Sequence, residues 1–305
     1  MSIKIGCTAW SLTPTYNPPF DDAIDTIAEL GFQGVELIVT NRQEMDEYYT
    51  PAQCARLAKQ VASHNMRVSE FVVYAHMIEG LASLDKAKRA TALADFEHGA
   101  KIAKALGSEI INTVSHWIPG LTAPIPYPPG YVYVTVPGVQ RFQPKLTFKY
   151  PDFDWEQIWN NYVESMRLCA EIAAHYGLRF ALEGHPHVIV SHTDSFLRLF
   201  EHAKNDNLGM NFDTGMQADQ REYIPISIKK LGNKIFHMHV RDSDSLVTHQ
   251  LPIGQGVLDW YAILGALKQV GYHGFLSIEL GSYTDPVRWL VESKNYLERV
   301  LTELA

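Results

Sequence analysis

The sequence is poor in cysteine and in positive charge, and each shortage disfavours a class of protein. Its three cysteines, Cys7, Cys54 and Cys169, lie far apart among 305 residues and in no metal-ligand spacing. This disfavours a disulfide framework and indicates a reducing compartment. Lysine and arginine number 26 against 34 aspartates and glutamates, which gives a net charge of -8. Because nucleic-acid phosphates must be met by basic side chains, we expect no nucleic-acid partner.

Long apolar runs are also missing. No stretch approaches the roughly 18 apolar residues that a membrane helix needs, and the N-terminus lacks the basic and apolar regions of a signal peptide. We therefore expect a soluble, cytoplasmic protein without a membrane partner. The chain is 46% hydrophobic and 20% charged, which excludes wholesale disorder and is enough for a large core.

Short β-branched runs alternate with longer segments of helical period along the whole chain. The predicted strands are 3–7, 34–39, 68–74, 110–114, 179–183, 209–213, 235–240 and 275–280. The predicted helices are 21–30, 51–63, 87–106, 155–175, 195–203, 258–269 and 286–304. Eight strands, each followed by a helix or a connection of helix length, predict an α/β fold, a (β/α)₈ TIM barrel. No G-x-G-x-x-G follows the first strand, which removes the main support for a dinucleotide-binding sheet.

One segment differs from the rest in composition. Residues 118–151 hold eight of the sixteen prolines, six aromatic residues, three basic residues and no acid. Since no linker divides the chain, we expect residues 1–305 to form one domain with 118–151 as an insertion after strand 4. At the carboxyl end of a barrel strand, such a loop would lie on the catalytic face. It is predicted to act as a lid, or as a docking loop for a second subunit or a second copy of the chain.

Four successive strands finish in residues that bind metal ions. These are Glu183, Asp213, His239 and Glu279, each after an apolar run. Carboxyl ends of barrel strands converge on one mouth, and an uncompensated buried carboxylate is costly. Any one of them read alone is as well explained by a capping or ion-paired acid.

Three carboxylates and one imidazole are hard ligands. They suit Mn²⁺ best, with Mg²⁺ or Co²⁺ as alternatives, rather than structural Zn²⁺. His237 lies on the same strand face as His239 but deeper, so we expect His239 to be the ligand and His237 a deeper layer or supporting residue.

Several motifs together resemble one family. The segments L-E-G-H-P, N-F-D-T-G, H-M-H-V-R-D and S-I-E-L, with K-I-G-C-T-A-W-S near the start and P-I-G-Q-G-V-L-D-W near residue 256, are similar to the xylose isomerase-like TIM-barrel superfamily of sugar isomerases and epimerases. The resemblance implies that Glu183, Asp213, His239 and Glu279 bind one divalent ion. It also implies that the two glutamates flank the substrate as acid and base.

The sequence departs from this family at three positions. Relatives commonly have histidine where Met216 stands, and ketose 3-epimerases have glutamate and arginine where Ile189 and Ser245 stand. These differences weaken the interpretation of the chain as an epimerase of free ketoses. The missing histidine and the acidic charge also disfavour the related DNA-repair endonucleases.

The ligand set nevertheless indicates a reaction type. A divalent ion on a carbonyl and its neighbouring hydroxyl stabilises an enediolate, so a carboxylate can remove the α-hydrogen. We therefore predict a metal-dependent sugar isomerase or epimerase acting on a keto sugar. The alternative enzyme is a lyase of the same superfamily that eliminates the aglycone from a 3-keto-glycoside, as C-glycoside-cleaving barrel subunits do. A third alternative is a non-catalytic barrel that binds sugar or a partner protein, although all four ligands are present.

Four further residues complete the predicted site. His185 shares the strand face of Glu183 and is predicted to contact substrate or to serve in acid–base catalysis; the alternative is a histidine packed in its loop. Trp10, His116 and Arg241 also stand at strand ends and are predicted to bind substrate. The alternatives are packing of the barrel top for Trp10 and a capping role for His116.

Overall fold

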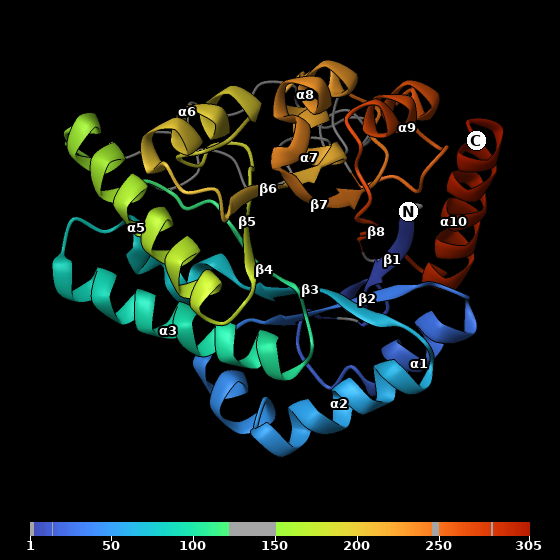
Figure 1. Ribbon diagram of the computed structural model, residues 1–305, viewed down its shortest axis with the longest axis horizontal. Coiled ribbons are helices and arrows are strands. Elements are labelled where there is room, and N and C mark those ends of the chain that lie inside the picture. The colour runs from blue at the N-terminus through green and yellow to red at the C-terminus, as the bar shows by residue number, and fades with distance from the viewer. Residues whose placement is uncertain (1–2, 14, 122–150, 246–249, 282) are drawn as a thin grey trace, which may run out of the picture.

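A computed structural model describes residues 3–13, 15–121, 151–245, 250–281 and 283–305. Its eight parallel strands form a closed barrel in which each strand pairs with the next and the last pairs with the first (Figure 1). The strands are β1 (Lys4–Thr8), β2 (Gly34–Val39), β3 (Arg67–Val73), β4 (Ile110–Val114), β5 (Arg179–Glu183), β6 (Leu208–Asp213), β7 (Ile235–Val240) and β8 (Phe275–Ile278).

Helices surround the barrel on its outer side (Figure 1). They are α1 (Asp21–Glu29), α2 (Pro51–Ser63), α3 (Lys86–Ala105), α5 (Trp155–His175), α6 (Thr193–Ala203), α7 (Thr214–Asp219), α8 (Ile224–Leu231), α9 (Trp260–Gln269) and α10 (Pro286–Glu303). Short 3₁₀ or π segments cover Ala9–Ser11, Glu44–Tyr48, Ala75–Ala82 and Gly232–Lys234. No helix within the described ranges combines the length and apolar character needed to cross a bilayer.

The predicted (β/α)₈ barrel is confirmed. Strands β2, β4, β5 and β7 and helices α2 and α5 have the predicted bounds, and the other predicted elements differ by one or two residues at an end. The short helices α7 and α8 between β6 and β7 were not predicted, because six and eight residues carry too little helical period to be seen. Of the insertion predicted over residues 118–151, positions 122–150 lie outside the described residues, and with them the predicted lid or docking role.

Helix starts follow local chemistry. Asp85 and Asp154 cap α3 and α5 by accepting hydrogen bonds from backbone N–H groups of the first turn, which would otherwise have no partner. Thr50 caps α2, and Pro51 occupies its first position, where a missing N–H costs nothing. These caps fix where α2, α3 and α5 begin.

Two glycines allow aromatic rings to close the barrel. A Cβ on Gly209 would lie 2.2 Å from Cγ of Phe236, and one on Gly34 would lie 2.5 Å from Cε1 of Phe275. Both distances are far below van der Waals contact. The small residues on β2 and β6 therefore let the rings of β7 and β8 lie directly against neighbouring backbone.

Substituting Gly209 tests this packing. Gly209→Ala is expected to lower the free energy of unfolding by about 1–3 kcal/mol, because the methyl group must displace the Phe236 ring. Gly265→Ala in α9 is the matched control, since its Cβ would meet nothing within 4 Å. At that position the higher helix propensity of alanine should raise the free energy of unfolding by about 0.5–1 kcal/mol. Urea unfolding of both variants measures the difference, and equal stability would contradict the packing argument.

Candidate active site

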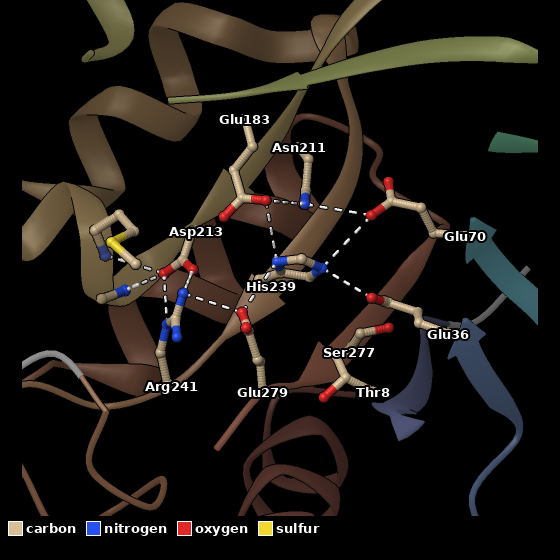
Figure 2. Close-up of polar contacts among 12 residues, drawn as sticks. Thr8, Glu36, Glu70, Glu183, Asn211, Asp213, His239, Arg241, Ser277 and Glu279 are labelled. Atoms are coloured by element: carbon tan, nitrogen blue, oxygen red, sulfur yellow. Dashed lines mark hydrogen bonds and ion pairs between the residues drawn. The ribbon is translucent and has the colours of Figure 1, made fainter. Parts of the chain in front are cut away.

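The four predicted metal ligands meet at one point. Glu183, Asp213, His239 and Glu279 each place one ligand atom within 4.8 Å of the others, and all four are buried. Figure 2 shows the three carboxyl groups around the His239 imidazole. The register explains the meeting, because Asp213 pairs with His239 across β6 and β7, and His239 pairs with Ser277, two residues before Glu279.

Asp213 is held by the start of the helix that follows it. Its Oδ1 accepts hydrogen bonds from the backbone N–H groups of Gly215 at 2.8 Å and Met216 at 3.0 Å, so it caps α7. The side chain cannot rotate without leaving these donors unpaired. Met216, where relatives commonly have histidine, therefore still serves the site through its backbone.

Arg241, predicted to bind substrate, is paired with two of the predicted ligands. Its guanidinium donates from Nε to Asp213 Oδ1 at 3.1 Å, forms a further ion pair with Asp213 Oδ2, and lies 3.0 Å from Glu279 Oε2. The side chain is buried, and these carboxylates raise its pKa despite that burial. Arg241 borders the cavity described below, but its charge is already balanced by the site.

Glu279 is oriented by Trp10 from the opposite end of the chain. The indole Nε1 donates to Glu279 Oε1 at 3.0 Å, and the Trp10 ring meets the His239 ring edge-on at 6.3 Å. Burial opposes ionisation of Glu279, but Arg241 and His239 outweigh it and lower its pKa to about 2. Trp10, predicted to bind substrate, thus also fixes which oxygen of Glu279 faces the centre.

The two carboxylate oxygens of Glu183 have different hydrogen-bond partners. Oε1 lies 2.8 Å from Nε2 of His185, and Oε2 accepts from Asn211 Nδ2 at 3.1 Å. Burial would raise its pKa, but His239 and His185 outweigh burial and lower it. His185 lies beside Glu183 as its shared strand face predicted, and its side chain is 21% exposed, against 3% for Glu183.

The centre fits a divalent cation. His239 Nδ1 lies 3.4 Å from Glu183 Oε2 and 3.2 Å from Glu279 Oε2. Among the described residues, Nδ1 of His239 and Oε2 of Glu279 have no hydrogen-bond partner although both atoms are buried, and Oε2 has only ion pairs with Arg241 and His239. Buried polar atoms left unsatisfied are costly, and an ion coordinated by all four side chains would satisfy them. Oxygen ligands with one imidazole match Mn²⁺, Mg²⁺ or Co²⁺.

A second layer of polar residues lies beneath this centre. Glu36 on β2 faces Nε2 of His239 at 2.8 Å and Nε2 of His237 at 2.5 Å, and Glu70 on β3 lies 3.5 Å from Nε2 of His239. The two imidazoles lower the pKa of Glu36 to about 2 against the effect of burial, whereas burial raises that of Glu70 to about 7. Both oxygens of Glu36 are thus used to hold imidazole rings.

This layer was largely missed from the sequence. Glu36, Glu70 and Asn211 were not predicted as residues of the site. The available signal was a carboxylate in the middle of each of two buried strands, since such a group needs a partner. His237 lies one layer below His239, as its place on the strand indicated.

A large cavity opens above the centre. Its volume is about 1230 Å³, and Glu183, His239 and Glu279 lie in its wall with His185 and Arg241. Trp10, Tyr16 and Tyr74 form an aromatic side of it, with ring centroids 6.1 Å apart for Trp10 and Tyr16 and 6.5 Å apart for Tyr16 and Tyr74. His116, predicted to bind substrate, also lines this cavity.

The pH dependence of stability should report on His116. Burial, with a smaller effect of His76, lowers its pKa from 6.5 to about 3. The unfolded state therefore binds the proton more readily, so this group contributes stability above pH 6.5 that is lost as pH falls toward 3. At pH 5.5 the loss should be about 1 kcal/mol. Urea unfolding at pH 5.5 and 7.5 should show a smaller difference for His116→Gln than for wild type. If the two differences are equal, His116 is not neutral in the folded protein.

A comparison with family models decides the family. Residues 24–300 match the model described as "Xylose isomerase-like TIM barrel". The chain belongs to the xylose isomerase-like TIM-barrel family. This confirms the resemblance drawn from the strand-end motifs and is consistent with the closed barrel.

Curated relatives match part of the chain. An inosose isomerase of Bacillus velezensis is 30% identical over 133 residues, which cover 41% of this chain and 48% of the relative. The chain thus spans about half the length of the curated relatives it matches.

Solved structures match nearly the whole chain. A D-psicose 3-epimerase from Clostridium cellulolyticum H10 superposes with a TM-score of 0.78 at 18% identity, covering 98% of this chain and 99% of that one. A 3-keto-D-glucoside 4-epimerase from E. coli gives a TM-score of 0.73 at 15% identity, covering 98% and 100%. At 18% and 15% sequence identity, these superpositions establish a shared fold and nothing more.

Proposed function

We propose that this protein is a divalent-metal-dependent sugar isomerase or epimerase that removes the proton α to the carbonyl of a keto sugar. The observation that carries the proposal is the buried meeting of Glu183, Asp213, His239 and Glu279, of which all but Asp213 line a large cavity. The names of the relatives described above, an inosose isomerase and two sugar epimerases, support it.

Glu183, Asp213, His239 and Glu279 would hold the ion, with Mn²⁺ preferred. When bound, it would act as a Lewis acid on the substrate carbonyl and the neighbouring hydroxyl, which acidifies the hydrogen between them. Glu183 and Glu279 would then act as the acid–base pair. Each has one oxygen toward His239 Nδ1 and the other held elsewhere, by His185 for Glu183 and by Trp10 for Glu279.

His185 would connect Glu183 with solvent. Its Nε2 lies 2.8 Å from Glu183 Oε1, and its partly exposed ring can exchange protons with water. A proton taken by Glu183 could therefore pass to the imidazole and be replaced from solvent. Glu279 Oε1 instead accepts from the indole of Trp10, which is buried. The two carboxylates would thus differ in how quickly their protons exchange.

Solvent deuterium exchange tests the proposal. The protein with Mn²⁺ is incubated in D₂O with a panel of keto sugars, including inosose, D-fructose, D-tagatose and a 3-keto-glucoside, and exchange at the α-carbon is read by NMR. We expect exchange into at least one, its loss with a chelator, and its return with Mn²⁺. Absence of both exchange and Mn²⁺ binding would contradict the proposal and favour a non-catalytic barrel.

A second candidate is elimination of an aglycone from a 3-keto-glycoside. The observation that favours it is the cavity, whose volume of about 1230 Å³ exceeds the roughly 300–1,000 Å³ of ordinary small-molecule pockets and whose side carries Trp10, Tyr16 and Tyr74. Aromatic rings of this kind can pack against a planar aglycone. Incubation with an aryl 3-keto-glycoside and with the keto sugar alone separates the candidates. Release of free aglycone would establish the lyase, and exchange without release would exclude it.

A further inference from the structure

Three side chains near the end of β4 form a chain of hydrogen bonds. Tyr162 of α5 places its hydroxyl 3.0 Å from Nδ1 of His116 and 3.1 Å from Oγ of Ser115, and it accepts the backbone N–H of His116 at 3.2 Å. Ser115 Oγ in turn accepts the backbone N–H of Val190 at 3.0 Å. All three side chains are buried, so these contacts are not shared with bulk water.

The direction of the chain follows from counting donors. If Ser115 donates to Tyr162 and Tyr162 donates to Nδ1 of His116, every hydroxyl hydrogen has an acceptor. In the reverse direction, Nδ1–H donates to Tyr162 and Tyr162 donates to Ser115. The Ser115 hydrogen and the lone pair of Nε2 then both lack a partner among the described residues, whereas the first direction leaves only Nε2–H unpaired. Buried polar groups in native proteins are almost always paired, so the direction with one unpaired group is favoured over the direction with two.

This direction fixes the tautomer of His116. An imidazole that accepts at Nδ1 carries its hydrogen on Nε2 when it is neutral. Burial lowers the pKa of His116 to about 3, so the ring is neutral near pH 7. Nε2 is the ring nitrogen without a hydrogen-bond partner among the described residues, and the residue lines the cavity above the candidate metal centre.

We propose that Tyr162 is a positioning residue that locks His116 as a neutral donor, so that its Nε2–H binds an acceptor oxygen of the substrate. The inference rests on the proposed function, because it assumes an oxygen-rich substrate in this cavity. An uncharged donor can bind a hydroxyl or carbonyl oxygen without requiring a phosphate. It also stays in the same protonation state across the neutral pH range, unlike an exposed histidine.

The tautomer can be measured without any substrate. The Mg²⁺-loaded protein is labelled with ¹⁵N-histidine, and the His116 signals are assigned by their absence from His116→Gln. Long-range ¹H–¹⁵N spectra at pH 7 should show hydrogen on Nε2 and none on Nδ1. Tyr162→Phe, which keeps the ring and removes the hydroxyl, should change that pattern. Tyr272→Phe is the matched control, since it loses a buried hydroxyl bonded to the Phe275 carbonyl oxygen and should leave His116 unchanged.

Two substitutions of His116 test the donor itself. The amide nitrogen of glutamine can reach the position of Nε2, whereas that of asparagine reaches only the position of Nδ1. In the deuterium exchange assay, His116→Gln should therefore retain a kcat/KM about tenfold above that of His116→Asn. Tyr162→Phe should lower kcat/KM about fivefold or more with an unchanged Mn²⁺ affinity.

Each outcome supports or overturns the inference. Hydrogen on Nδ1, a charged ring, or an unchanged pattern in Tyr162→Phe would overturn the role of Tyr162. Equal activity of His116→Gln and His116→Asn would overturn substrate binding by Nε2–H. If wild-type protein exchanges no keto sugar at all, the proposed function and the substrate contact both fail. The tautomer result would still decide whether Tyr162 locks the ring.

Discussion

Glu183→Gln and Glu279→Gln are each expected to lower solvent deuterium exchange by about 10²–10⁴-fold, which is the usual contribution of a positioned acid or base. Glutamine keeps the shape and one oxygen for the ion but cannot accept the proton. In the proposed mechanism one carboxylate removes the proton and the other returns it, so both single variants should lose net isomerisation. NMR of a keto sugar incubated with each variant and Mn²⁺ in D₂O measures how much deuterium enters at the α-carbon.

Mn²⁺ titrations distinguish the two roles of these glutamates. A variant that still binds Mn²⁺ but no longer exchanges hydrogen has lost the acid or base, whereas one that no longer binds has lost a ligand. Glu109→Gln is the matched control, since its side chain is 75% exposed at the start of β4 and should leave exchange unchanged. Normal net isomerisation by either Glu183→Gln or Glu279→Gln would exclude the two-carboxylate mechanism.

Glu36→Gln is expected to weaken Mn²⁺ binding by about 10–100-fold, although Glu36 is not one of the four proposed ligands. The carboxylate accepts from Nε2 of both His239 and His237. It thereby turns Nε2 of His239 toward itself and leaves Nδ1 facing Glu183 and Glu279, where it would bind the ion. Glutamine offers a single acceptor oxygen, and its amide group would oppose the second imidazole. Isothermal titration with Mn²⁺ measures the change in Kd.

The same Glu109→Gln variant serves as control for this experiment, since it makes the same chemical change far from His239. Circular dichroism and a thermal melt establish that Glu36→Gln is folded before its Kd is compared. An unchanged Kd in a folded Glu36→Gln protein would show that His239 is oriented without Glu36.

The fold and the upper half of the site were predictable from the sequence for a physical reason. Strand-end residues such as Glu183 and Asp213 follow apolar runs that must be buried, and a parallel barrel brings all carboxyl ends to one mouth. The alternation along β7 likewise placed His239 above His237. These inferences need only local pattern and the symmetry of the barrel.

The contacts between strands could not be predicted in the same way. The pairing of Arg241 with Asp213 depends on a register shift between Met210 and Asn211, which no local pattern reveals. The contact between Glu36 and His239 crosses the barrel interior and joins residues 203 positions apart. Trp10 likewise reaches Glu279 only because the barrel closes. Such distances follow from strand tilt and stagger rather than from composition.

The join between β1 and β8 sets the order in which the site can be completed during synthesis. Trp10 donates to Glu279, and Ser11 Oγ contacts both the backbone N–H and the carbonyl oxygen of Leu280. The first strand leaves the ribosome long before the last, and the four proposed ligands lie between residues 183 and 279. A nascent chain lacking β8 has three of these ligands, and its Trp10 has no carboxylate to hold. Assembly of the complete ion-binding centre therefore waits for β8 and reports the closed barrel.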